Sequence, residues 1–180
     1  SELMRDAGYV TGQIGKWDVG DKEQGPHRCG FMEVAKWAPL DWQGEYSFLY
    51  TCNHPDGSVR YRTEVDGDYM VEFIERNKDK PFFLYFSPVA VHDPLEKTPK
   101  KYIDRVKTGN NKWYAGALLS LDDQIGRMID VLKKHNLDEN TIILFNSDNG
   151  PNIKAGSPEP FRGYKTHMWE EGFVRTPAIV

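Results

Sequence analysis

Side chains that could bind a metal ion or an anion occur at four separate places in this 180-residue chain. Asp148 and Asn149 set a carboxylate beside an amide oxygen, and both are hard oxygen ligands of the kind that Ca²⁺ or Mg²⁺ prefers. Lys16 and Lys165 could each hold an oxyanion as a point charge. His92 could donate a hydrogen bond to an anion or act as a general acid. These residue types indicate a cationic, metal-capable site for an anion.

Each of these residues also has an ordinary structural interpretation. An Asp-Asn-Gly sequence is typical of an Asx turn at the end of a strand. A single lysine is more often a solvated surface residue, and a lone histidine after a strand more often has a structural role. Calcium needs about six to eight oxygen ligands, so Asp148 and Asn149 would need further ligands from elsewhere.

The elements expected around these residues bring three of the four places to one edge of a sheet. Apolar, β-branched or aromatic runs predict three strands, at residues 9–14, 82–86 and 141–145. These strands are followed in turn by Lys16, by His92 and by the Asp148–Asn149 pair. In open α/β sheets, functional groups gather at the carboxyl ends of the strands. The strands at 82–86 and 141–145 lack alternation, which predicts burial on both faces.

Two amphipathic helices are expected between the strands. Apolar spacing predicts a helix over 63–78 that is capped by Thr63, and a longer one over 111–135. Strands that alternate with helices predict an α/β fold, a largely parallel mixed sheet with helices on both faces. Residues 16–62 show no sustained period and are rich in Gly, Pro and aromatic residues, which predicts a long loop.

The composition excludes several classes of protein. The 23 Lys and Arg residues against 27 Asp and Glu give a formal net charge of −4, without a basic block. This argues against nucleic acid or a membrane surface as a partner bound by bulk charge. No apolar run approaches the ~20 residues of a membrane-spanning helix. The two cysteines, Cys29 and Cys52, could form one disulfide or be two buried thiols.

Five blocks of sequence follow one another along the chain. They are Ile-Gly-Lys-Trp-Asp-Val-Gly at 14–20 with the preceding 7–11, the run at 80–85 leading to Val-His-Asp-Pro-Leu at 91–95, residues 121–126, Ser-Asp-Asn-Gly at 147–150, and the segment from 162 to 177. In type and order these blocks resemble the sulfatase family, the formylglycine-dependent sulfuric-ester hydrolases of the alkaline-phosphatase-like superfamily. The Val-His-x-Pro-Leu pattern is similar to the arylsulfatase B-like branch.

The resemblance implies a role for each candidate residue. Asp148 and Asn149 would be two ligands of a Ca²⁺ ion, with Mg²⁺ as the other option. Lys16 would contact the formylglycine and the sulfate, while His92 and Lys165 would contact the sulfate oxygens and assist the leaving group. The substrate would be an aryl or carbohydrate sulfate ester, and a formylglycine-generating enzyme would be a partner of the parent protein. A periplasmic, secreted or lysosomal location is also implied.

The chain departs from the family pattern in two respects. Asp18 stands where the family normally has a histidine that helps to break the intermediate, so Asp18 is a less well supported catalytic candidate. The family's first motif, Cys or Ser followed by x-Pro-x-Arg, is not found at Cys29, at Cys52 or at any serine. The nucleophile is therefore expected upstream. Residues 1–180 are expected to be one partial catalytic domain, incomplete at both ends and without a separate second domain.

Two other functions remain open from the sequence. Asp18 and the missing nucleophile would also suit a catalytically inactive sulfatase-like remnant. The same scaffold could instead hydrolyse a phosphodiester or phosphonate, because phosphoryl and sulfuryl groups share a tetrahedral shape. The Gly-Lys-Trp block favours sulfate over phosphate. Under any of these readings, the isolated 180-residue chain is expected to be inactive.

Overall fold

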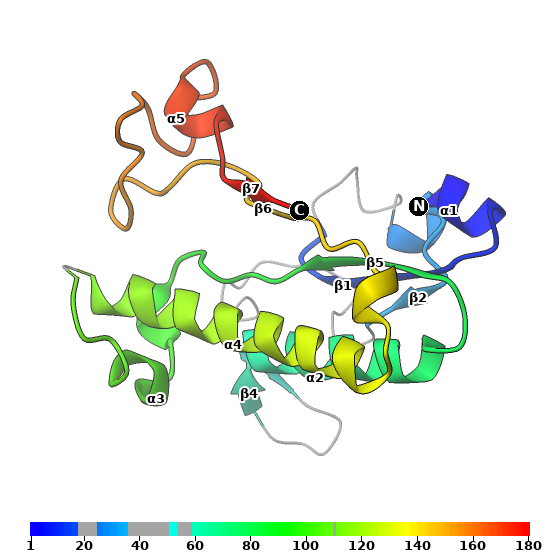
Figure 1. Cartoon of the computed structure of the whole chain (residues 1–180). Helices are drawn as coiled ribbons and strands as arrows, with labels where there is room; N and C mark the ends of the chain where they lie inside the picture. Colours follow the sequence, from blue (N-terminus) through cyan, green and yellow to red (C-terminus); the bar gives the residue numbers. More distant parts are fainter. Residues whose placement is uncertain (18–24, 36–50, 54–58, 110) are drawn as a thin grey trace. The chain divides into compact units, whose positions relative to one another are not determined.

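The computed structural model describes residues 1–17, 25–35, 51–53, 59–109 and 111–180. The chain divides into two compact units, Ser1–Asp138 and Glu139–Val180, and each is described by itself. Figure 1 shows the elements of both units coloured along the sequence. No helix in the described part of the chain is long and apolar enough to cross a membrane.

A parallel sheet forms the centre of the first unit. Its strand order is β2 (Glu33–Val34), β1 (Val10–Gly15) and β5 (Phe82–Ser87). Strands β1 and β5 pair in register along their whole length, from Val10 opposite Phe82 to Gly15 opposite Ser87. The predicted strands at 9–14 and 82–86 are therefore confirmed, and their carboxyl ends lie side by side.

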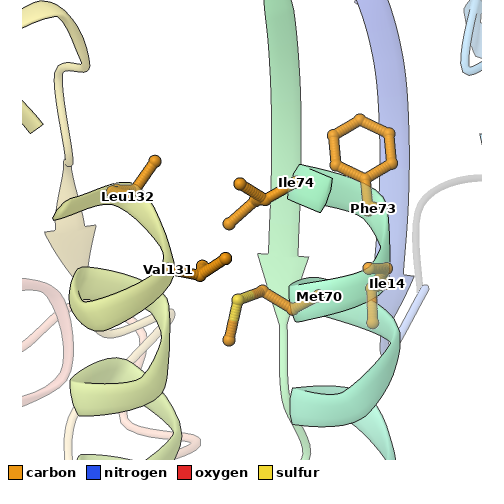
Figure 2. Packing of buried hydrophobic residues seen from close by; sticks show 6 residues of the cluster. All are labelled: Ile14, Met70, Phe73, Ile74, Val131 and Leu132. Atoms are coloured by element: carbon orange, nitrogen blue, oxygen red, sulfur yellow. The ribbon is translucent and has the colours of Figure 1, made fainter. Parts of the chain in front are cut away.

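Two long helices cover one face of this sheet (Figure 1): α2 (Arg62–Asn77) and α4 (Lys112–Lys134). Figure 2 shows the core between them and the sheet, built from the buried side chains of Ile14, Met70, Phe73, Ile74, Val131 and Leu132. Phe82, Leu84 and Phe86 of β5 pack against the same core. A parallel sheet flanked by helices confirms the predicted α/β class.

The ends of the two helices test the predicted helix bounds and the predicted Thr63 cap. Helix α4 follows Asn111, whose side-chain Oδ1 accepts a hydrogen bond from the Tyr114 amide at 3.0 Å, so the predicted helix is confirmed to within a residue at each end. The predicted cap of α2 is wrong. The N-cap residue is Tyr61, which makes no side-chain cap hydrogen bond, and Thr63 is buried in the first turn. The helix begins directly after strand β4 (Val59–Tyr61), so the chain enters it without a capping loop.

The remaining elements of the first unit are short. Helix α1 (Glu2–Asp6) precedes β1, and α3 (Lys100–Ile103) precedes α4. The 3₁₀ helices are η1 (Pro26–Cys29), η3 (Leu95–Lys97) and η4 (Asp138–Asn140), the last of which crosses into the second unit. Strand β3 (Thr51–Asn53) pairs antiparallel with β4. The expectation of a loop without regular structure over 16–62 is therefore wrong, because η1, β2, β3 and β4 fall within it.

The second unit contains one small antiparallel ladder and one short helix. Strand β6 (Phe145–Asn146) pairs with β7 (Ala178–Ile179), and helix α5 (Glu171–Val174) precedes β7. The predicted buried strand over 141–145 is wrong for most of its length, because residues 141–144 are irregular and Ile142 is 88% exposed. The physical reason is the short partner strand. Only two residues of β7 pair with β6, so the ladder contains Phe145 and Asn146 alone on this side.

Candidate active site

The end of β1 holds Lys16 by its main chain. The Lys16 amide donates to the Ser87 carbonyl oxygen at 2.6 Å. The Ser87 hydroxyl donates to the Lys16 carbonyl oxygen, also at 2.6 Å, and lies 3.3 Å from the carbonyl oxygen of Ile14. The two strand ends are thus joined in both directions, and the position of the Lys16 backbone is fixed at the carboxyl edge of the sheet.

A buried glutamine adds to this support. The side-chain Nε2 of Gln13 donates to the carbonyl oxygen of Gly15 at 3.1 Å and lies 3.4 Å from that of Lys16. Gln13 is 2% exposed, so the amide satisfies carbonyl groups that have little access to water. The sequence analysis missed Gln13 and Ser87. Their signal is a polar residue inside or directly after an otherwise apolar strand.

Gly15 allows the strands to approach this closely. Its φ is +106°, a conformation that side chains other than glycine rarely adopt, and a Cβ atom at this position would collide with the Ser87 carbonyl group. Any larger residue would therefore separate the two strand ends, along with the residues that follow them.

An aromatic cluster packs beside Lys16, which is half-buried. The Trp17 ring meets Phe31 edge-on at a centroid distance of 5.7 Å and Tyr85 at 6.4 Å. Phe31 also stacks on Phe83 at 6.3 Å. Such edge and stacked contacts fix ring positions. The cluster therefore fixes the ring of Trp17, the residue next to Lys16.

His92 follows the neighbouring strand β5 and is half-buried. Its backbone amide donates to the Val89 carbonyl at 2.9 Å, and its Nδ1 lies 2.8 Å from the Asp93 carbonyl oxygen. A carbonyl oxygen only accepts, so Nδ1 carries the proton in this contact. Nε2 is then the atom that can accept a proton, or donate one when the ring is charged. Lys16 and His92 follow the same ends of adjacent parallel strands.

In the second unit, Asp148 and Asn149 follow β6 after one intervening residue, Ser147. The Asp148 side chain is exposed and Asn149 is half-buried. The Asn149 Nδ2 donates to the Gly150 carbonyl at 2.8 Å, and the Ser147 hydroxyl donates to the Asn149 carbonyl at 2.9 Å. These contacts use the amide nitrogen and leave the Oδ1 oxygen as an acceptor.

This pair of oxygen donors fits a hard divalent cation by its chemistry, but two side chains do not complete a site. Among the residues that the structure describes, no group of three or more His, Cys, Asp or Glu side chains could hold a metal ion. Asn149 would not count toward such a group, because its ligand is an amide oxygen.

Lys165 is attached to the segment that carries the oxygen pair. Its backbone amide donates to the Pro151 carbonyl at 2.9 Å, and the Gly150 amide donates to the Phe173 carbonyl at 2.8 Å. The Gly172 amide donates to the Arg162 carbonyl at 2.8 Å. The second unit therefore brings together the backbones of the Asp148–Asn149 segment, the Lys165 segment and α5. Asp18 lies outside the described residues.

The strongest shifts in pKa occur away from these candidates. Burial raises the pKa of Asp66 on α2 to about 6, although the Arg62 guanidinium at 3.1 Å offsets part of the effect. Burial also raises the pKa of Tyr102, and the hydrogen bond from its hydroxyl to Glu64 adds to the shift. The Tyr102 hydroxyl thereby links α3 to Glu64 of α2, whereas the Asp66–Arg62 pair lies within α2.

Comparison with known proteins identifies one family over the whole chain. The family model described as Sulfatase matches residues 1–180. An arylsulfatase of Hemicentrotus pulcherrimus is 32% identical over 209 aligned residues, which cover 100% of this chain and 37% of that protein. The N-acetylgalactosamine-6-sulfatase of Homo sapiens is 29% identical and is matched over 99% of this chain and 38% of its own length.

Solved structures show the same similarity. The structure described as Ps i-CgsB in complex with k-i-k-neocarrahexaose has a TM-score of 0.79 and 28% identity, and the match covers 98% of this chain and 45% of that one. The PsFucS1 sulfatase from Pseudoalteromonas sp. has a TM-score of 0.74 and 27% identity, over 99% of this chain and 43% of that one. The chain spans less than half the length of each of these proteins.

Proposed function

The chain belongs to the sulfatase family, and on that premise we propose that it forms part of a catalytic domain that hydrolyses sulfate esters. The observation that carries the proposal is the joined carboxyl edge of β1 and β5. Lys16 is fixed there by reciprocal hydrogen bonds with Ser87, and the His92 loop leaves the neighbouring strand at the same edge. A cation and an imidazole that share one edge suit an anionic ester.

Lys16 would bind sulfate oxygens through its ammonium group. A sulfate monoester is an anion whose oxygens gain charge during transfer. A cation held in a fixed position stabilises that charge in the transition state better than bulk water does. Once its ring is protonated, His92 would donate a hydrogen bond to the sulfate through Nε2, because the Nδ1 proton is committed to the Asp93 carbonyl. In this state it could donate the Nε2 proton to the departing alkoxide.

Three further candidates, Lys165, Asp148 and Asn149, belong to the second unit. Lys165 would supply a second cation for the sulfate and the leaving group, while Asp148 and Asn149 would hold a calcium ion by their oxygens. Bound calcium would supply positive charge that stabilises an anionic ester. No Cys or Ser of this chain fits the motif whose first residue is converted to formylglycine. A formylglycine from another part of the intact protein would supply the nucleophilic oxygen as a hydrated aldehyde.

We propose an aryl or carbohydrate sulfate as the substrate. Two relatives named above support this class, an arylsulfatase and an N-acetylgalactosamine-6-sulfatase. In addition, one similar structure holds a neocarrahexaose. A formylglycine-generating enzyme would be needed for the intact protein.

The test uses the intact protein that contains this chain, coexpressed with a formylglycine-generating enzyme and assayed on 4-nitrophenyl sulfate. Lys16→Ala should lower kcat/KM by about 10²–10³-fold, the loss typical of removing one donor to a developing oxyanion. Lys80→Ala is the matched control, because Lys80 is exposed and precedes the same sheet at its opposite, amino-terminal end. The control should keep the native rate.

The same assay separates the alternatives. Faster turnover of 4-nitrophenyl phosphate or its diester than of the sulfate would make the protein a phosphoryl hydrolase. An absence of sulfate turnover, with formylglycine verified by mass spectrometry, would support an inactive remnant. In that case Asp18→His restores activity if the carboxylate alone impairs the site.

A further inference from the structure

One carboxylate connects the two sides of the turn that carries Lys165. The Arg162 Nε donates to Glu170 Oε1 at 2.9 Å, and the Nδ1 of His167 donates to Glu170 Oε2 at 3.2 Å. Arg162 lies three residues before Lys165 and His167 two residues after it. Glu170 therefore closes a ring of contacts around the lysine.

The backbone under this carboxylate is shaped to receive it. Gly163 has a φ of +96°, and a Cβ atom there would collide with the Glu170 carboxylate. A glycine is thus required where the carboxylate crosses the chain. On the other side of Lys165, Thr166 has a φ of +84°, a conformation that is costly for a β-branched residue. Such a conformation persists only where the surrounding contacts fix it.

Further contacts leave little freedom in the turn except at the lysine side chain. The His167 ring lies edge-on to Tyr164 at a centroid distance of 6.2 Å. The His167 amide donates to the Tyr164 carbonyl, and the Glu170 amide donates to the His167 carbonyl, each at 2.9 Å. The Lys165 amide donates a hydrogen bond to the carbonyl of Pro151, which follows the Asp148–Asn149 segment.

We propose that Glu170 is a positioning residue for Lys165: by holding Arg162 and His167 it fixes the turn that carries the lysine. The proposal rests on the proposed function, because it assumes that Lys165 contacts the substrate. Arg162 is 91% and His167 51% exposed, and ion pairs in water contribute little to global stability. Loss of Glu170 should therefore change the substrate site far more than the stability of the protein.

The neighbouring glutamate provides a matched control. Glu171 has the same charge and pairs with Arg175 at 3.3 Å, with both side chains more than 60% exposed. This pair joins the first residue of α5 to Arg175, directly after the helix, and does not span the Lys165 turn. Glu171→Ala therefore removes a carboxylate and an ion pair one residue away without opening the turn.

The experiment measures kcat and KM on 4-nitrophenyl sulfate for the intact, formylglycine-bearing protein and its variants. Glu170→Ala should lower kcat/KM by about tenfold, the lower end of the loss seen when a supporting hydrogen-bond partner is removed. KM should rise, as it should in Lys165→Ala. Glu170→Gln should recover most of the loss, since its amide oxygen still accepts from Arg162. Glu171→Ala should match the native protein.

The double variant Lys165→Ala/Glu170→Ala decides whether Glu170 acts through the lysine. It should be no slower than Lys165→Ala alone, because there is then no ammonium group to position. Additive losses would overturn the proposal. So would a fall in kcat at unchanged KM for Glu170→Ala, which indicates a smaller folded fraction.

The same set separates this inference from the function on which it rests. If Lys165→Ala keeps the native kcat/KM, the proposed substrate role of Lys165 is wrong, and the inference falls with it. If Lys165→Ala is impaired while Glu170→Ala is not, only the positioning role is wrong. Thermal unfolding of each variant identifies any that fail to fold. If Glu170→Ala fails, Arg162→Ala and His167→Asn each remove one of its contacts instead. A smaller rise in KM is expected for each of these two variants.

Discussion

Lys16 and Ser87 bind each other through two hydrogen bonds of 2.6 Å: the Lys16 amide donates to the Ser87 carbonyl, and the Ser87 hydroxyl donates to the Lys16 carbonyl. Neither bond uses the lysine side chain. The hydrogen bonds that hold this edge of the sheet therefore do not depend on the lysine ammonium group. Lys16→Ala should remove the ammonium group without moving the backbone.

Gly15→Ala should damage the same edge from the backbone side. The new Cβ would meet the Ser87 carbonyl, and the positive φ would add strain of about 1–3 kcal/mol. We expect a lower unfolding free energy, together with a fall of roughly 10²-fold in kcat/KM, as a displacement of about 1 Å can cause. Denaturant unfolding and steady-state kinetics of the intact protein measure both effects.

The control for this variant is Gly126→Ala in helix α4. A Cβ at Gly126 meets no atom within 4 Å, and alanine favours the helix over glycine, so this variant should gain roughly 0.5–1 kcal/mol and keep its activity. Equal behaviour of the two variants would show that the close approach of β1 and β5 has no special requirement for glycine.

Removal of calcium should lower the unfolding temperature of the intact protein. If Asp148 and Asn149 hold the ion, calcium at about 100 times its Kd stabilises the folded state by about 2.7 kcal/mol. Thermal unfolding with calcium and with a chelator should differ for the native protein and coincide for Asp148→Ala. Glu159→Ala, an exposed acid of the same unit, should keep the difference. A calcium effect that persists in Asp148→Ala would place the ion elsewhere.

Stability should fall as the pH rises from about 4 to 6 because of Asp66. Burial raises the pKa of this group from 3.8 to about 6 in the folded state, so in this range the folded protein binds more protons than the unfolded chain. The contribution of Asp66 to the free energy of unfolding then decreases with pH, by up to about 3 kcal/mol over the window. Denaturant unfolding at several pH values measures this slope.

Asp66→Asn should flatten the slope, since the amide does not titrate. Asp130→Asn, an exposed acid on α4, should leave the slope as it is in the native protein. A slope that survives Asp66→Asn would assign the pH dependence to another group.

The sequence was sufficient for elements whose signal is local. The runs before Lys16 and before the His92 loop are recognisable as strands, and the apolar face of α4 extends over six turns with Asn111 as a cap. The shared edge of β1 and β5 follows from the parallel rule alone. The roles of Lys16, His92, Lys165, Asp148, Asn149 and Asp18 stay predictions.

What the sequence did not supply depends on distant partners. The extent of β6 is set by β7, more than 30 residues later, and no local pattern gives that limit. Strands β2, β3 and β4 are two or three residues long, too short for a period to be seen. Glu170 was missed because its significance lies in the contacts with Arg162 and His167, which an acidic residue near a short helix does not reveal by itself.

Strand β5 has apolar side chains on both faces, with Phe82, Leu84 and Phe86 toward the helices and Phe83 and Tyr85 toward Phe31. A slip of one residue would exchange these two sets, and hydrophobicity alone distinguishes the two arrangements poorly. Gly12 and Gly15 distinguish the two arrangements, because neither has a side chain. The Phe73 ring occupies the space beside Gly12, and a Cβ atom at Gly15 would collide with the Ser87 carbonyl. These two glycines, which bury no side chain of their own, thus favour the native register of β1 and β5.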